Sequence, residues 1–132
     1  MSRILVVDAS VVVDLLARFH PQPLEELLWA SDTVLTAPEL IDVEVLSALR
    51  KLDRAGVIPA GRRAELPAMM RGLRIRKYRH ASLIDGIWAL REIVTAYDAA
   101  YVTLARLLGA PLVTRDARLA RAAGLKIKTV TP

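Results

Sequence analysis

The chain has 132 residues, of which 54% are hydrophobic and 25% charged, so it is long enough to bury a core and too apolar to be disordered. No apolar run approaches the roughly 20 residues of a membrane-spanning helix, and the absence of cysteine excludes disulfides and thiolate zinc sites. We therefore expect one domain, residues 1–132, in the cytoplasm and without a membrane partner.

Charge is unevenly distributed along the chain, which carries a formal net charge of +5. Between Arg50 and Arg79 there are ten Lys or Arg but only two acids, Asp53 and Glu65. Such a block can bind the phosphates of a polyanion, and it is also typical of the solvated helical surface of an arginine-rich protein. Charge alone leaves both interpretations open.

Strands and helices are expected to alternate along the chain. In chain order we expect a strand at 3–7, helices at 10–19 and 23–30, a strand at 33–36, helices at 39–55 and 60–73, a short edge strand at 75–79, helices at 80–94 and 97–109, a strand at 111–114, a helix at 117–124 and a strand at 126–130. The first strand, RILVV, is apolar throughout, as in a strand covered on both faces. Ser10 can cap the helix that follows, and Pro67 can split or kink the helix at 60–73.

This alternation predicts an α/β fold in which a parallel sheet has helices on both faces. Ligands of such sheets gather beyond the carboxyl ends of the strands. Asp8 directly follows the first strand, and Asp116 comes shortly after the strand at 111–114. Asp98 lies near the start of an apolar helix. Each of these acids, taken alone, is equally typical of a helix N-cap.

A fourth acid comes from the helix at 39–55, which carries Glu39, Asp42 and Glu44. Helical geometry puts Glu44 on one flank of the apolar face and Asp42 on the other, so periodicity disfavours only Glu39. Four segments that each bring a carboxylate to one end of a sheet would be an unusual way to cap helices. Clustered carboxylates need a cation, and an all-oxygen ligand set favours Mg²⁺ or Mn²⁺ over zinc.

Three segments carry a resemblance to a known family: VVDASVVVDLL (6–16), PELIDVEVLSALRK (38–51) and TAYDAAYVTLARLLGAPLVTRDARLA (95–120). They resemble PIN domains, and more closely the VapC ribonuclease toxins of bacterial toxin–antitoxin pairs. The third segment is the most specific, and the resemblance follows nearly the whole chain in order. It implies a three-layer fold with a central parallel sheet of about five strands, in the order 3-2-1-4-5.

The resemblance also implies a set of site residues. Carried over residue by residue, these are four acids and two supporting hydroxyls: Asp8, Glu44, Asp98 and Asp116, with Ser10 and Thr114. Three of the acids are expected to bind Mg²⁺ or Mn²⁺, whereas Glu44 either binds the metal or orients the attacking water. The family pattern thus selects Glu44 over Asp42. Some relatives have a further acid after the last motif, which this sequence lacks, so one metal ion or two remains an open alternative.

The function that the resemblance implies is metal-dependent hydrolysis of RNA phosphodiester bonds, by a homodimer that a cognate VapB-type antitoxin inhibits, with a hetero-oligomer of the two as a further assembly. Five residues of the basic segment are assigned to RNA binding from charge alone: Arg50, Lys51, Arg54, Arg74 and Arg76. The alternative is a catalytically degenerate PIN-fold module that binds RNA or protein without turnover. The presence of all four acids counts against it.

The remaining polar and aromatic residues are given ordinary structural roles. We expect core packing for the aromatic residues, with contacts to the antitoxin or the second subunit as the alternative for Phe19 and Trp29. Surface or capping positions are expected for four further acids. The aromatic residues are Phe19, Trp29, Trp88, Tyr97 and Tyr101, and the acids are Asp14, Asp42, Asp53 and Asp85. His20 and His80 are isolated in the sequence and are assigned no catalytic role. A haloacid-dehalogenase-type phosphotransferase is disfavoured because Ser10 stands where it would need a second Asp, and the acid pattern of a receiver domain is not met.

Overall fold

The computed structural model describes residues 3–17, 26, 28–30, 32–121 and 129–130. Their strands form one parallel sheet in the order β3-β2-β1-β4-β5, which confirms the expected α/β fold and strand order. The strands are β1 (Arg3–Val7), β2 (Thr33–Pro38), β3 (Ile75–Tyr78), β4 (Leu112–Val113) and β5 (Thr129–Val130). Residues 126–128 of the last expected strand lie outside the described residues.

The central strand β1 forms the middle of the core. Leu5, Val6 and Val7 are completely buried, as expected for an apolar strand that is covered on both faces. In the sheet, Val6 pairs with Thr36 of β2 and Val7 pairs with Val113 of β4. The strand order reverses between β2 and β4, on either side of β1, so the end of β1 lies at the point where ligands of such sheets bind.

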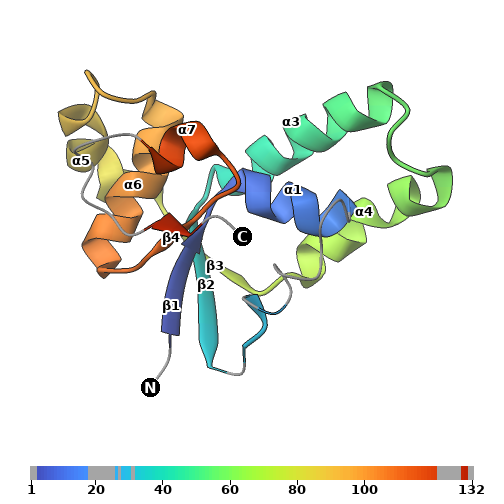
Figure 1. The fold of residues 1–132 in the computed structure, drawn as a ribbon, viewed down its shortest axis with the longest axis horizontal. Coiled ribbons are helices and arrows are strands. Elements are labelled where there is room, and N and C mark those ends of the chain that lie inside the picture. The colour runs from blue at the N-terminus through green and yellow to red at the C-terminus, as the bar shows by residue number, and fades with distance from the viewer. Residues whose placement is uncertain (1–2, 18–25, 27, 31, 122–128, 131–132) are drawn as a thin grey trace.

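Helices cover both faces of the sheet. They are α1 (Ala9–Ala17), α3 (Ile41–Arg54), α4 (Ala60–Gly72), α5 (Ile84–Ala89), α6 (Ala96–Leu108) and α7 (Ala117–Ala120), with a 3-10 turn at His80–Leu83. In Figure 1, α1, α3 and α4 lie on one side of the strands and α5 and α6 on the other. Among the described residues no helix is both long and apolar enough to cross a bilayer. Most of the helix expected at 23–30 lies outside the described residues.

Two of the expected helices differ from the structure. The segment 80–94 forms a 3-10 turn and the short helix α5, after which the chain turns so that α6 can pack against α5. Gly86 allows this packing, because a Cβ at its position would overlap the side chain of Thr103 in α6. Pro67 does not split its helix: α4 continues through it.

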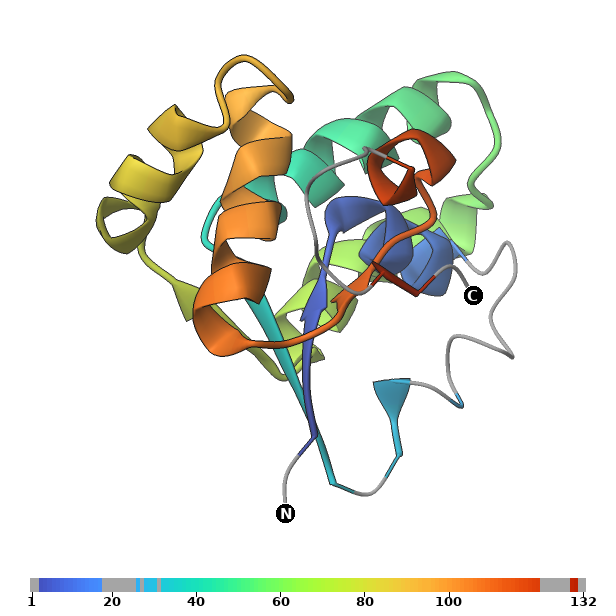
Figure 2. The same cartoon turned by 60° about the vertical axis from the view of Figure 1, so that its left-hand side comes forward.

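The elements that carry the acids meet at one end of the sheet. In both views the start of α6, the start of α3 and the short helix α7 gather beyond the carboxyl end of β1 (Figure 1, Figure 2). The parallel sheet therefore positions the candidate site, because each of these elements begins at the same edge.

Candidate active site

Asp8 directly follows β1 and is the most enclosed of the four acids, with 6% of its surface exposed. Its carboxylate accepts hydrogen bonds from Ser10 Oγ at 2.5 Å and from Thr114 Oγ1, and a longer one of 3.4 Å from the Val11 N–H. Burial raises the pKa of the Asp8 carboxyl, and the hydrogen bonds only partly oppose that rise. Ser10 therefore contacts Asp8 with its hydroxyl, from within the first turn of α1, instead of capping the helix.

Glu44 lies in the first turn of α3 and points toward α6, where Tyr101 Oη donates to its Oε1 at 2.6 Å. Burial raises the pKa of the Glu44 carboxyl, and the charges of Asp98 and Asp8 raise it further. Burial and the hydrogen bond to Glu44 also raise the pKa of the Tyr101 phenol, so its proton stays available for donation. Asp42 is paired elsewhere, with Lys77 Nζ at 2.8 Å. The structure thus places Glu44, and not Asp42, beside the other acids.

Asp98 does not cap its helix. The N-cap of α6 is Thr95, whose hydroxyl oxygen accepts the Asp98 N–H at 3.2 Å. The Asp98 side chain is left to face the site, where its Oδ2 accepts a hydrogen bond of 2.8 Å from Arg118 Nη2. Capping was the simplest interpretation of this acid in isolation, and the structure gives that role to a residue three positions earlier.

Asp116 both caps a helix and faces the site. Its Oδ1 accepts the N–H groups of Arg118 at 2.9 Å and Leu119 at 3.3 Å, which makes it the N-cap of α7. Its Oδ2 accepts from Arg118 Nη2 at 3.2 Å. The Asp116 N–H donates to Thr114 Oγ1 at 2.9 Å, and the same hydroxyl donates to Asp8. Thr114 therefore links the first acid to the last.

Three contacts of this site involve residues that sequence reasoning missed. Tyr101 lies three positions after Asp98, one turn further along the same helix, which was the available signal for its approach to the site. The contact between Arg118 and Asp98 could not be foreseen from the sequence, because the two residues are 20 positions apart. Asp14 was expected at the surface or in a cap and instead pairs with Arg115 Nε at 2.8 Å, since α1 packs beside the loop after β4. The Arg115 N–H also donates to Ser10 Oγ.

The donor set suits a hard divalent cation in type and in charge. The acids offer only carboxylate oxygens, and the effect of Asp8 and Asp98 on Glu44 shows that three of them act on one electrostatic site. The carboxylates are, however, too far apart to surround one ion. The described part of the chain has no group of three His, Asp or Glu side chains at metal-binding separation. A guanidinium group stands between Asp98 and Asp116. The residues thus fit Mg²⁺ or Mn²⁺ in chemistry, provided that this guanidinium group can leave.

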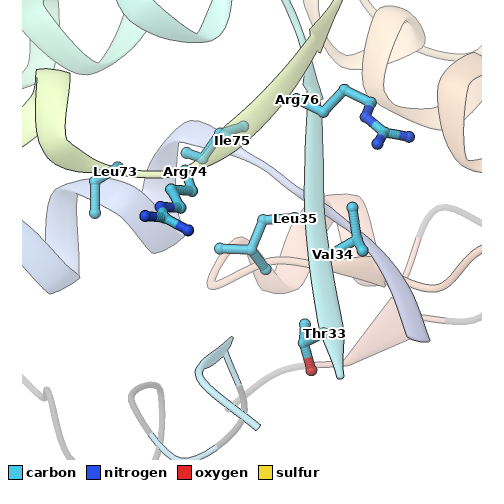
Figure 3. A pocket seen from close by; sticks show the side chains of 7 residues that line it. All are labelled: Thr33, Val34, Leu35, Leu73, Arg74, Ile75 and Arg76. Atoms are coloured by element: carbon cyan, nitrogen blue, oxygen red, sulfur yellow. The ribbon is translucent and has the colours of Figure 1, made fainter. Parts of the chain in front are cut away.

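The structure does not bring the five basic residues together. Lys51 lines a groove of about 470 Å³ with Glu44 and Tyr97, next to the acids. Arg74 and Arg76 line a separate groove of about 380 Å³ with residues Thr33, Val34 and Leu35 at the start of β2, away from the carboxyl end of the sheet. In Figure 3 the two guanidinium groups lie on either side of β2. The other two, Arg50 and Arg54, are exposed on α3.

Of the five aromatic residues expected in the core, three are exposed, and Phe19 lies outside the described residues. Trp88 is 67% exposed, Tyr97 65% and Trp29 55%. Trp88 lies on the outer side of the short helix α5, where Arg91 stacks over its ring at 4.6 Å from the centroid. Tyr97 lies in the first turn of α6, beside Asp98. Only Tyr101 is buried, and its hydroxyl serves the site.

The chain that forms this three-layer α/β fold matches a known family in sequence. Residues 5–125 match the PIN domain, and the chain belongs to the PIN-domain family. Within it the chain groups with the VapC proteins. It is 38% identical over 117 residues to Ribonuclease VapC3 of Mycobacterium tuberculosis, covering 89% of this chain and 85% of that protein. It is 40% identical over 121 residues to Ribonuclease VapC1 of the same species, covering 91% of each.

Solved structures show the same fold. The chain superposes on PAE2754 from Pyrobaculum aerophilum with a TM-score of 0.68 at 24% identity, over 97% of this chain and 92% of that one. It superposes on VapBC2 from Rickettsia felis, solved bound to a DNA fragment from its promoter, with a TM-score of 0.70 at 15% identity, over 96% and 97% of the two chains. At these identities the likeness concerns the fold.

Proposed function

We propose that this chain is a metal-dependent endoribonuclease and the toxin of a VapBC-type toxin–antitoxin pair, acting in the cytoplasm with residues 1–132 as a single domain. One observation carries the proposal: acids from four separate segments face one end of a parallel sheet, where Thr114 links Asp8 to Asp116 and Arg118 links Asp116 to Asp98. The relatives at 38% and 40% identity are named as ribonucleases, which supports the choice of RNA as substrate.

In this proposal each acid has a defined task. Asp8, Asp98 and Asp116 are the ligands for Mg²⁺ or Mn²⁺, and a bound ion would supply Lewis-acid stabilisation of a phosphate oxygen and a lower pKa for water. Ser10 and Thr114 fix the rotamer of Asp8. Glu44 either joins the ligands or orients the attacking water, and its hydrogen bond from Tyr101 fixes the position of its carboxylate for that task. In-line attack leaves a 5′-phosphate and a 3′-hydroxyl.

The RNA path is proposed to cross the groove beside Glu44. Lys51 lines that groove and can hold a phosphate, while Arg50 and Arg54 extend the same basic helix. Arg74 and Arg76 line the other groove, so a role for them requires RNA that wraps around the sheet edge. Their assignment rests on charge alone.

A cognate VapB-type antitoxin is proposed to cover the acid-lined groove, and the toxin is proposed to be a homodimer. The Rickettsia felis structure is named VapBC2, which joins the names VapB and VapC. This similarity supports an antitoxin partner for this chain as well. Exposed apolar residues are available for these contacts, among them Trp29 of an early segment, and Trp88 and Tyr97 on the helices α5 and α6. Phe19, the other early aromatic residue with a candidate role there, lies outside the described residues.

The alternative, a degenerate PIN-fold module that binds RNA or protein without turnover, is favoured by the ion pairs of Arg118 with two of the four acids. A cleavage assay separates the two. Purified protein should cleave structured RNA with Mg²⁺ or Mn²⁺ and not with EDTA, and Asp98→Asn should abolish cleavage while the fold is kept. Cleavage without metal, or full activity of Asp98→Asn, would contradict the catalytic proposal.

A matched pair of variants on one helix controls that assay. Glu44→Gln should remove activity, whereas Asp42→Asn, two residues away and paired with Lys77, should retain it. In cells, expression without a partner should arrest growth, and Asp8→Ala should relieve the arrest. Growth arrest that Asp8→Ala does not relieve would favour the binding module.

A further inference from the structure

Arg118 makes an unusual pair of contacts for a residue that the proposed reaction does not use. One nitrogen, Nη2, donates to Asp98 Oδ2 at 2.8 Å and to Asp116 Oδ2 at 3.2 Å. The two acids come from different elements, the first turn of α6 and the start of α7. A single cationic nitrogen therefore stands between two carboxylate oxygens that are both assigned to metal binding.

Arg118 offsets part of the negative charge of the acid site. Within the described ranges no other cation pairs with Asp98 or Asp116. The neighbouring cation, Arg115, pairs with Asp14. Asp98 also acts electrostatically on Glu44, so the site gathers negative charge that Arg118 offsets in part. The two acids in turn raise the pKa of the Arg118 guanidinium, which stays charged.

The contact is also built to be reversible. The Arg118 side chain is 64% exposed, and solvent-exposed ion pairs contribute little stability, so its release costs little. Asp116 uses Oδ1 to cap α7 and Oδ2 to contact the guanidinium. When the guanidinium leaves, Oδ2 is freed while Oδ1 still holds the carboxylate in orientation. Only a side chain has to move.

We propose that Arg118 is a tethered counter-ion of the acid site, which holds Asp98 and Asp116 while no divalent cation is bound and is displaced when one binds. The inference rests on the proposed function, since it requires that the acids bind metal. A lone pair that accepts a hydrogen bond from the guanidinium cannot also coordinate an ion at about 2.1 Å. Arg118 therefore competes with the metal and lowers the affinity of the site for it.

Mn²⁺ titration of the metal-free protein by calorimetry or by electron paramagnetic resonance tests the competition. Arg118→Gln should bind Mn²⁺ about fivefold more tightly than the wild type, the scale expected when two weak competing ion pairs are removed. Arg118→Lys, which keeps the charge, should restore an affinity close to that of the wild type. Arg121→Gln removes the same charge from the end of the same helix and should change affinity less than about twofold.

Each other outcome has a definite meaning. Unchanged or weaker Mn²⁺ binding by Arg118→Gln, relative to Arg121→Gln, would overturn the inference and make Arg118 a structural support of the carboxylates. If the wild type and the variants all fail to bind Mn²⁺, the proposed metal-dependent function fails, and the inference fails with it. Thermal unfolding of the metal-free proteins checks the fold, and added Mn²⁺ should raise the melting temperature of Arg118→Gln more than that of the wild type.

Discussion

The two halves of the acid site are held in different ways. Asp8 and Glu44 are held by hydroxyl groups, from Ser10 and Thr114 in one case and Tyr101 in the other, and burial raises the pKa of both carboxyls. Asp98 and Asp116 share a contact with a charged and exposed side chain, that of Arg118, although Asp116 is also held by the backbone N–H groups that it caps. A neutral hydroxyl in the interior fixes a rotamer, whereas an exposed ion pair is weak and exchangeable. One half is therefore preorganised and the other adjustable.

The largest effect on activity is expected from a substitution in the preorganised half of the site. Asp8→Asn should lower RNA cleavage by about three orders of magnitude or more, as expected when a central metal ligand loses its charge. Because Asp8 is buried and its pKa is raised, the neutral amide should leave the free energy of unfolding of the metal-free protein unchanged or higher. Urea denaturation and a cleavage assay on the same preparations measure both. A large loss of stability would mean that Asp8 supports the fold as well as the site.

A smaller effect should follow from removing the hydroxyl that holds Glu44. Tyr101→Phe keeps the buried ring and deletes one hydrogen bond of 2.6 Å. Supporting groups of this kind typically contribute about 10- to 100-fold to activity, and the bond itself about 1 kcal/mol to stability. Single-turnover cleavage rates check the first value. Tyr97→Phe, on an exposed ring of the same helix, is the control and should have little effect on stability.

The pH dependence of stability should report on the preorganised half, Asp8 and Glu44. A carboxyl whose pKa is raised in the folded state binds its proton more tightly there than in the unfolded chain, so protonation stabilises the fold. The contribution of Asp8 and Glu44 should be complete below their ordinary pKa values, 3.8 and 4.5, and lost as pH rises through the raised ones. The double variant Asp8→Asn, Glu44→Gln should lack this contribution in metal-free urea denaturation at several pH values. Equal pH profiles for variant and wild type would refute the burial argument.

The smallest effect is expected in the adjustable half. Arg118→Gln should leave the free energy of unfolding of the metal-free protein nearly unchanged, because the side chain is mostly exposed and exposed ion pairs contribute little. High salt should weaken the ion pairs further in the wild type. A clear loss of stability in urea denaturation would show that the contact is structural and remove the contrast between the halves.

The fold was predictable from the sequence because it follows from short-range patterns. RILVV has the composition of a buried strand, and Asp8 comes directly after it, so the position of the first acid at a strand end needed no tertiary information. The alternation of strands and helices predicted the parallel sheet. The helix at 80–94 was predicted too long, because its apolar pattern continues past Ala89, where the structure ends α5 and packs it against α6.

The site was only partly predictable, because its contacts join distant segments. Periodicity could not separate Glu44 from Asp42, since the group that distinguishes them is Tyr101, 57 positions away. Asp98 resembled a cap because its partner in the site comes 20 positions later. The basic residues were grouped by sequence proximity, whereas Lys51 and Arg74 line different grooves. The number of charges in a segment does not show which side of the molecule each side chain faces.

Thr114 gives the site a property that belongs to none of its acids. Its single hydroxyl donates to Asp8 and accepts from the backbone N–H of Asp116, so it sets the span between the end of β1 and the start of α7. The separation of two proposed ligands is thus defined by a side chain that has no part in coordination. Replacing Thr114 with a residue that lacks the hydroxyl would remove this link between Asp8 and Asp116 without altering one charge.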